Sequence, residues 1–424
     1  MAERISQIIE HLRGNPLTRL QSKSPDDVVI VLALRTPLCK ARRGGFRDTS
    51  TDRLLLRTFQ SFVSRLEDMS VPISSVEDVT VGSVLGEGGL AYKARAAALA
   101  AGLSEKTPIQ IVNRFCSSGL MAVSVVANQI RNREIECGLA LGFESMTNNP
   151  DKGAGEAGFD GEISAVSIAA DCLQPMGWTS ENVAGQFGIS RESMDLVALR
   201  SHQRASRARA SGLFREEIVP ILADFITGEK DGVPVKEKRL VDEDDGIRDE
   251  TTLETLKNLR PAFPNWPPSR TTAGNASQIT DGASYVLLMS RRKAVQLNCK
   301  ILGKYVQTQV IGLEPRIMGI GPSLAIPRLL EKVGLKIDDI DLFEINEAFA
   351  SMYVYCLERL NLDINKVNVN GGAIALGHPL GCTGTRLIVT GLSELRRRKL
   401  KVMVVSMCIG LGMGAAGLVL AEYD

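Results

Sequence analysis

Short apolar stretches alternate along the chain with longer stretches in which apolar residues recur every three or four positions. Residues 28–33 are continuously apolar, which is typical of a strand buried on both faces of a sheet. Residues 52–66 carry helical spacing instead, and the same alternation continues beyond them. We expect strands over 28–33, 76–81, 139–143 and just before Cys116, and helices over 52–66, 92–101 and 117–130. The alternation predicts an α/β protein whose helices and sheets pack in layers.

The later part of the chain repeats the order of these elements. VEDVTVGSV at 76–84 matches IDDIDLFEI at 337–345, and LALGF at 139 matches VVSMC at 404. VNRFCSSG at 112 corresponds in the same way to VNVNGGAIALGHPLGCTG at 367, with offsets of about 255 to 265 residues. The repeat predicts two similar α/β halves packed as a pseudo-dimer, with the reactive loops of both halves on one side.

Composition divides the chain into four parts. We expect a targeting segment and linker over 1–26, an N-terminal half over 27–147 with 271–296, and a C-terminal half over 297–424. Residues 148–270 form an inserted loop domain with a charged, turn-rich stretch, GEKDGVPVKEKRLVDEDDG, that is typical of a solvated hairpin. Four arginines of this insertion are either ordinary surface residues or face phosphates: Arg200, Arg204, Arg207 and Arg209.

Residues 402–421 are the one stretch that imitates a membrane span, with 20 residues and no charge. Its four glycines make a helix costly, and the flanks VMVV and LVL suit strands. We therefore expect two buried strands joined by a glycine turn and no transmembrane segment. The G-x-G-x-x-G pattern in the turn is not expected to bind a dinucleotide, because no helix and ribose-binding acid follow it.

Residues 1–13 place apolar side chains on one face of a predicted helix. The spacing of Arg4 and Ile5 from His11 and Leu12 resembles the type-2 peroxisomal targeting signal, a helix face that a soluble import receptor recognises. This interpretation places the chain in the peroxisomal matrix and names the import receptor as a partner. The alternative is a frayed amphipathic terminus.

Net charge and cysteine spacing argue against a nucleic-acid-binding protein, a metalloprotein and a secreted disulfide-rich protein. The net charge of +1 provides no basic field for a polyphosphate backbone, so no nucleic-acid partner is expected. The eight cysteines are scattered without a C-x-x-C pair, which predicts neither a metal site nor a secreted disulfide framework. Imidazole chemistry must come from one of three histidines, His11, His202 or His378.

Cys116 lies where a β-prone run gives way to a predicted helix. The free N–H groups and the dipole at a helix start favour negative charge, so we expect a lowered thiol pKa and a thiolate nucleophile. The alternative is a buried cysteine that packs as a small hydrophobe. His378 and Cys408, in GGAIALGHPLGCTG and SMCIGLGMG, supply a base and a second thiol and favour catalysis.

Several stretches together resemble the thiolase family, most closely its peroxisomal 3-ketoacyl-CoA members. They are NRFCSSGLMAV, SENVA, RPAF, TAGNASQITDGA, MGIGP, FEINEAFA, GGAIALGHPLGCTG and SMCIGLGMGAA. The resemblance covers about residues 27–422 and implies a five-layered thiolase fold and a homodimer. It also implies an acyltransferase that cleaves 3-ketoacyl-CoA with CoA in fatty-acid β-oxidation, with CoA as a substrate and no cofactor.

The resemblance assigns five residues to catalysis. Cys116 carries the acyl group as a thioester, His378 takes the thiol proton, and Cys408 moves the proton at the acetyl carbon. A thiol suits this last role because its pKa can be tuned toward neutrality. Asn346 holds a water that makes one oxyanion hole with His378, and the N–H groups of Cys116 and Gly410 make the other.

For CoA, the resemblance points to Met176 in the pantetheine channel, Ser277 near its amides and Arg248 near the nucleotide. Trp178 and Leu411 depart from the family pattern, which leaves acyl-chain preference and rate open. One alternative is an acetoacetyl-CoA thiolase that works in the condensing direction with the same residues. The other is a non-catalytic lipid-binding relative, which the joint presence of the two thiols and the histidine disfavours.

Overall fold

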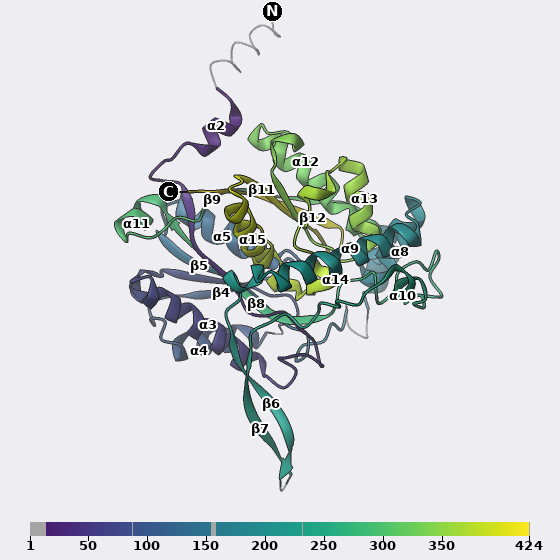
Figure 1. Ribbon diagram of the computed structural model, residues 1–424, viewed down its shortest axis with the longest axis horizontal. Coiled ribbons are helices and arrows are strands. Elements are labelled where there is room, and N and C mark those ends of the chain that lie inside the picture. Colours follow the sequence, from purple (N-terminus) through teal and green to yellow (C-terminus); the bar gives the residue numbers. More distant parts are fainter. Residues whose placement is uncertain (1–13, 87, 154–157, 231, 424) are drawn as a thin grey trace, which may run out of the picture.

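The computed structural model describes residues 14–423 except 87, 154–157 and 231. Its framework is a ten-stranded sheet with the order β10-β11-β12-β9-β1-β8-β5-β3-β4, and β2 pairs with β8 off this path (Figure 1). The strands β1 (Val28–Arg35) and β9 (Gly303–Gly312) pair antiparallel at the middle of the sheet. This pairing joins an N-terminal and a C-terminal half.

The N-terminal half of the sheet combines parallel and antiparallel strands. Its other members are β2 (Cys39–Lys40), β3 (Asp78–Gly82), β4 (Ile109–Val112), β5 (Cys137–Ser145) and β8 (Thr280–Ser290). Strands β3, β4 and β5 are parallel, and β8 runs antiparallel between β5 and β1. Both β5 and β8 are buried along their whole length, including polar residues such as Glu144 and Asp281.

The C-terminal half repeats this arrangement. Its strands are β9, β10 (Leu342–Ile345), β11 (Val402–Ile409) and β12 (Met413–Ala421). Strands β10 and β11 are parallel and β12 runs antiparallel between β11 and β9, so β10-β11-β12-β9 mirrors β3-β5-β8-β1. The predicted repeat of two similar halves is confirmed. The apolar stretch 402–421 forms β11 and β12, as expected, and among the described residues no helix is long and apolar enough to cross a membrane.

Helices form three layers around the two half-sheets. The outer layers are α3 (Thr51–Asp68) with α4 (Leu90–Ala100), and α12 (Gly321–Val333) with α13 (Ala350–Leu360). The central layer is α5 (Ser118–Arg131) with α15 (Leu380–Arg398), which lie between the half-sheets (Figure 1). Three buried apolar clusters fill the spaces between successive layers. The chain is therefore a five-layered α/β protein, as the resemblance implied.

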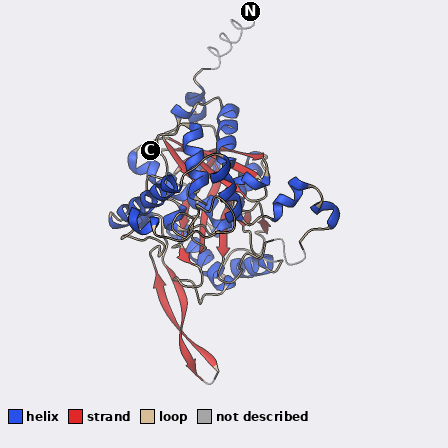
Figure 2. Cartoon of the chain, turned by 90° about the vertical axis from the view of Figure 1, so that its right-hand side faces the viewer, coloured by secondary structure: helices blue, strands red, loops and turns tan. Residues whose placement is uncertain are grey.

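Residues 148–270, the predicted insertion, lie in the chain between β5 and β8. They contain α6 (Gly161–Ser164), α7 (Ser167–Ala170), α8 (Met176–Gln186), α9 (Arg191–Ala210), α10 (Leu253–Lys257), β6 (Ile221–Lys230) and β7 (Val233–Val241). Strands β6 and β7 form the predicted solvated hairpin, which projects from the body (Figure 2). Two of the four arginines have structural partners: Arg204 donates to the carbonyls of Ile364 and Val367, and Arg209 pairs with Asp249.

Shorter helices complete the chain. They are α2 (Pro16–Gln21), α11 (Arg291–Gln296), α14 (Ala373–Leu376), and the 3₁₀ helices η1 (Ile73–Ser75), η2 (Asp171–Leu173), η3 (Leu213–Glu216), η4 (Pro315–Ile320), η5 (Ile337–Asp339) and η6 (Ile364–Lys366). The candidate targeting residues Arg4, Ile5, His11 and Leu12 lie outside the described residues. The four-part division of the chain stays a prediction.

Candidate active site

The loop that presents Cys116 connects β4 to α5 and is fixed by its own side chains. Asn113 Oδ1 accepts the N–H of Phe115 at 2.9 Å, and Ser118 Oγ donates to Phe115 O at 2.7 Å. Phe115 has a φ of 46°, a left-handed conformation that is uncommon for a bulky residue. Cys116 follows it directly, two residues before the first turn of α5. The predicted location at a helix start is confirmed.

The Cys116 thiol is buried, and its pKa is raised to about 11. Burial is the largest cause, because a thiolate loses its hydration there. The N–H groups of Gly410 and of Cys116 itself oppose it, and the charge of the buried Glu144 carboxylate adds to the rise. The predicted lowering of this pKa is therefore wrong: two N–H groups do not compensate for the loss of water. Cys116 is therefore a neutral thiol, which would need a base to act as a nucleophile.

The turn 410–412 joins β11 to β12 beside Cys116. At Gly412 (φ 83°) a Cβ would lie 2.2 Å from Leu313 O, so only glycine fits. At Gly410 a Cβ would lie 3.4 Å from the Phe115 ring, so packing within the chain does not itself demand glycine there. Leu411 has a φ of 67° and is partly exposed, which places an apolar side chain in a strained turn next to Cys116.

Cys408 lies near the end of β11, where almost none of its surface is exposed. Burial raises its pKa well above the ordinary thiol value, and the nearby Cys116 and Cys356 thiols add to this effect. The expectation of a thiol pKa tuned toward neutrality is therefore wrong. Cys408 is instead a protonated thiol close to Cys116, which is the form that can donate a proton.

His378 lies in the turn before α15 and is held at several points. Its backbone N–H donates to Gln278 O at 3.1 Å. Nδ1 lies 2.6 Å from Thr383 Oγ1, and Nε2 lies 3.3 Å from Asn346 Nδ2. Because the amide nitrogen of Asn346 can only donate, Nε2 accepts and Nδ1 carries the proton. Burial, aided by the positive charge of Arg386, lowers the His378 pKa to about 3, so the imidazole is neutral.

Asn346 follows β10 directly and is anchored by its backbone, whose N–H donates to Ser406 O at 2.9 Å. Its side chain is buried, and among the described residues its Oδ1 has no hydrogen-bond partner. A buried amide oxygen without a partner costs free energy unless another polar group meets it. The oxygen is therefore available to a water or a substrate group beside His378.

The three candidate CoA residues differ in their positions. Met176 begins α8, and its sulfur would lie 3.7 Å from a Cβ at Gly410. The N–H of Ser277 donates to Ala348 O, two residues beyond Asn346, at 3.0 Å. Arg248 is exposed, and its N–H donates to His202 Nδ1. The first two candidates thus lie beside the candidate catalytic residues Gly410 and Asn346, whereas nothing in the described contacts links Arg248 to them.

Trp178, which departs from the family pattern, stacks on Trp266 with ring centroids 4.0 Å apart and planes 8° apart. Trp266 Nε1 donates to Asn182 Oδ1 at 3.0 Å, which fixes the pair on the insertion. Trp178 is two positions from Met176 on α8, and positions two apart point to different sides of a helix. Its side chain therefore braces the loop 261–270.

Two polar residues of the site were not foreseen. Thr383 orients His378 and is contained in the GGAIALGHPLGCTG motif, where its hydroxyl was the available signal. Glu144 was signalled by a carboxylate at the end of an apolar strand, in LALGFES. Among the described residues, no group of His, Cys, Asp or Glu side chains is arranged to hold a metal ion.

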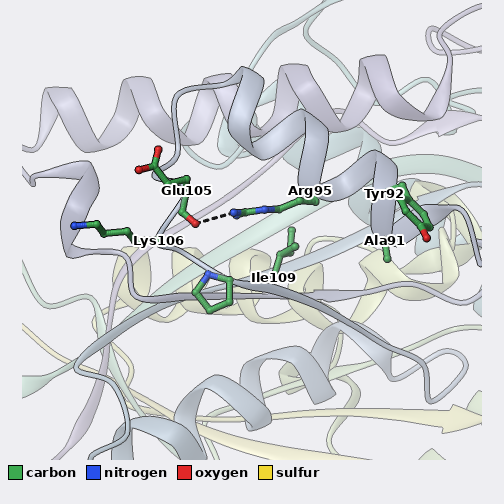
Figure 3. Close-up of a pocket in the computed structure, with 7 residues that line it drawn as sticks. Ala91, Tyr92, Arg95, Glu105, Lys106 and Ile109 are labelled. Atoms are coloured by element: carbon green, nitrogen blue, oxygen red, sulfur yellow. Dashed lines mark hydrogen bonds between the residues drawn. The ribbon is translucent and has the colours of Figure 1, made fainter.

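A surface cavity of about 550 Å³ lies between α4 and the start of β4, lined by Tyr92, Arg95 and Glu105 among others (Figure 3). Cys116 follows the opposite end of β4. The lining of this cavity includes none of the candidate catalytic residues.

Comparison with known proteins assigns the family. The model for the thiolase N-terminal domain matches residues 28–292, and that for the thiolase C-terminal domain matches residues 299–421. The chain belongs to the thiolase family. The peroxisomal 3-ketoacyl-CoA thiolase of Saccharomyces cerevisiae is 45% identical, and the alignment covers 100% of both proteins.

Solved thiolase structures show the same fold. The dimeric peroxisomal thiolase of Saccharomyces cerevisiae superposes with a TM-score of 0.87 at 46% identity, covering 96% of this chain and 100% of that one. Human mitochondrial 3-ketoacyl-CoA thiolase in complex with CoA gives a TM-score of 0.80 at 36% identity, covering 93% of this chain and 98% of that one. The predicted fold class and family are confirmed.

Proposed function

We propose that the chain is a 3-ketoacyl-CoA thiolase, which cleaves 3-ketoacyl-CoA with CoA to acetyl-CoA and a shortened acyl-CoA in peroxisomal fatty-acid β-oxidation. The observation that carries this proposal is the meeting of two buried thiols, Cys116 and Cys408, beside the N–H of Gly410. Relatives aligned over at least 98% of this chain and of their own length are named peroxisomal 3-ketoacyl-CoA thiolases, which supports it. CoA enters as a substrate.

Cys116 opens the reaction by attacking the 3-keto carbon while its proton passes to Nε2 of His378. Both groups start neutral, since burial raises the pKa of the thiol and lowers that of the imidazole. The bond between the α and β carbons then breaks, and its electron pair forms the enolate of acetyl-CoA. Cys408 donates its proton to the α carbon, which releases acetyl-CoA and leaves the acyl group as a thioester on Cys116.

The second half of the reaction restores each group. The thiol of CoA gives its proton to the Cys408 thiolate and attacks the thioester. Cys116 leaves as a thiolate and takes back the proton held by His378. Every proton moved in the first half is thus returned, and no oxidant or reductant is needed.

Two sets of donors stabilise the oxygens that become negative. The N–H groups of Cys116 and Gly410 hold the oxygen of the Cys116 adduct, and their approach to the sulfur supports this role. His378, with a water held by Asn346, holds the enolate oxygen, and the Asn346 Oδ1, which has no hydrogen-bond partner within the described part of the chain, supports this second site. Met176 and Ser277 line the pantetheine channel beside these groups, and Arg248 meets the nucleotide.

Thiolysis of two substrates tests the function and its direction. We expect CoA-dependent cleavage of a long-chain 3-ketoacyl-CoA as well as of acetoacetyl-CoA, with a new acyl-CoA of matching length. Cleavage of acetoacetyl-CoA alone would favour the condensing alternative, and turnover of neither substrate by the folded chain would favour the lipid-binding alternative.

The homodimer is proposed because the yeast relative is described as dimeric. In the described part of this chain, β4 ends the sheet and pairs with β3 alone, so its other edge can pair with a second copy. The exposed Tyr92 on α4 adds apolar surface beside that edge (Figure 3). Sedimentation of the purified chain as a 45.9 kDa monomer would contradict this assembly.

Residues 1–13 are proposed to be the peroxisomal address recognised by the import receptor. The described body begins after them, and the catalytic residues all lie beyond residue 115. Deletion of residues 1–13 is expected to leave thiolysis unchanged and to keep a fluorescently tagged chain in the cytosol. The measurement is imaging in cells whose own thiolase has been removed, so that the truncated chain cannot enter with a partner. Import of the truncated chain in those cells would refute the assignment.

A further inference from the structure

Glu144 is the next-to-last residue of β5, and its carboxylate lies in the interior of the molecule with none of its surface exposed. Resting on the proposed function, we propose that Glu144 is a positioning residue that holds the His378 turn in register with the Cys116 loop. It touches neither thiol nor imidazole in the described contacts. It acts by fixing the positions of the Cys116 loop and the His378 turn.

The Glu144 carboxylate joins two segments that are far apart in the sequence. On one side it accepts the N–H groups of Val84 at 2.9 Å and Leu85 at 3.1 Å, and the hydroxyl of Ser83 at 3.2 Å. On the other side it accepts the N–H of Gly381 at 3.0 Å. Gly381 lies in the first turn of α15, where backbone N–H groups have no partner within the helix. Glu144 therefore caps α15 from a strand of the other half.

Glycines on both sides let the backbones meet at this point. A Cβ at Gly381 would lie 2.5 Å from Ser83 Cα and 2.7 Å from Gly82 O. A Cβ at Gly82 would lie 2.2 Å from Ser118 O, at the start of α5. Real side chains do not approach so closely, so the loop after β3 contacts the starts of both α5 and α15 directly. Cys116 precedes one of these helix starts and His378 precedes the other.

The contacts of Glu144 with residues 83–85 and with Gly381 thus fix the positions of Cys116 and His378 relative to each other. The thiol of Cys116 has a raised pKa and the imidazole of His378 a lowered one, so the proton moves between them only during attack. Such a transfer depends steeply on distance and angle, because a displacement of about 1 Å can cost on the order of 10²-fold in rate. Loss of the Glu144 hydrogen bonds would therefore move the Cys116 thiol and the His378 imidazole apart without removing either side chain.

The charge of Glu144 and its positioning contacts have opposite effects on the reactivity of the Cys116 thiol. A variant without the charge therefore distinguishes the two by whether the thiol reacts faster or more slowly. Its negative charge raises the pKa of the Cys116 thiol, so it disfavours the thiolate. If Glu144 acted on Cys116 through charge alone, neutralising it would make the thiol more reactive. If it acts by positioning, neutralising it makes the thiol less reactive, because an amide in its place offers N–H groups to N–H donors.

The experiment is alkylation of Cys116 by iodoacetamide at neutral pH, followed by peptide mass spectrometry. Glu144→Gln is expected to react about tenfold more slowly than the native chain. Glu144→Asp, which keeps the charge but is too short to span both segments, is expected to be slow as well. Alkylation of Glu144→Gln at the native rate or faster would overturn the proposal. The measurement uses no 3-ketoacyl-CoA, so its outcome is independent of whether the proposed reaction is correct.

A matched control separates positioning from general damage to the fold. Glu181, on α8, is another fully buried carboxylate, and it accepts the N–H groups of Arg270 at 2.9 Å and Thr271 at 2.6 Å. Glu181→Gln is expected to lower the melting temperature as Glu144→Gln does, yet to leave the alkylation rate of Cys116 unchanged. Equal slowing in both variants would show a merely structural role for Glu144.

A double-mutant cycle identifies the group through which Glu144 acts. His378→Ala is expected to slow alkylation by removing the base, and adding Glu144→Gln to it is expected to cause no further slowing. Effects that multiply in the double variant would show that Glu144 does not act through His378, and the proposal would fail. A folded Glu144→Asp variant allows the same cycle if Glu144→Gln does not fold.

Discussion

Cys116→Ser is expected to lower thiolysis by about 10³-fold or more, because a hydroxyl is a far weaker nucleophile than a thiol at neutral pH. The side chain is buried and similar in size, so the fold should persist. After treatment with a 3-ketoacyl-CoA, the native chain should carry an acyl group on Cys116 and the variant should carry none. Mass spectrometry of proteolytic peptides measures this directly.

The control for this variant is Cys137→Ser. Cys137 is another buried thiol, and burial also raises its pKa. It lies at the start of β5, within the apolar core of the N-terminal half. Its substitution should leave the acyl group on Cys116 and thiolysis close to native in rate. An acyl group found on another residue of the native chain would contradict the assigned role of Cys116.

The hydrophobic pattern predicted the layers because buried strands and amphipathic helices space their apolar residues differently along the sequence. Residues 28–33 could be assigned to a buried strand since no polar position interrupts them, and β1 is indeed buried on both faces. Residues 402–421 could be assigned to two strands because glycines break the run where the turn 410–412 lies. The repeat then placed the two reactive loops on one side, which no single motif could do.

The pKa shifts and buried ion pairs of the interior could not be predicted from the sequence in this way. Whether the Cys116 thiol loses or gains acidity depends on how much water reaches it, and burial outweighs the N–H groups that the sequence suggested. Arg386 resembles an ordinary polar position of α15, yet it is fully buried, with Nη1 3.6 Å from Glu344 Oε2. The role of Glu144 likewise depends on contacts with Val84 and Gly381, which are distant from each other along the chain.

Cys408→Ala is expected to lose thiolysis by about 10²-fold or more, the usual scale for a general acid or base. Its proposed role is to move a proton at the α carbon, which is needed only when a carbon–carbon bond is broken or made. Exchange of an acyl group between acyl-CoA and labelled CoA passes through Cys116 without any such proton transfer at carbon. The variant should therefore keep much of its exchange activity while thiolysis falls, and the ratio of the two rates is the quantity to measure.

Cys356→Ala provides the matched control, because Cys356 is a fully buried thiol on α13 that lies close enough to Cys408 to raise its pKa. Its removal leaves a cavity of the same size but takes no group from the reacting carbon, so both activities should stay near native. Equal loss of exchange and thiolysis in a folded Cys408→Ala variant would mean that Cys408 positions Cys116 instead of moving the proton. The division of labour between the two thiols would then be wrong, since a single shared defect would account for both losses.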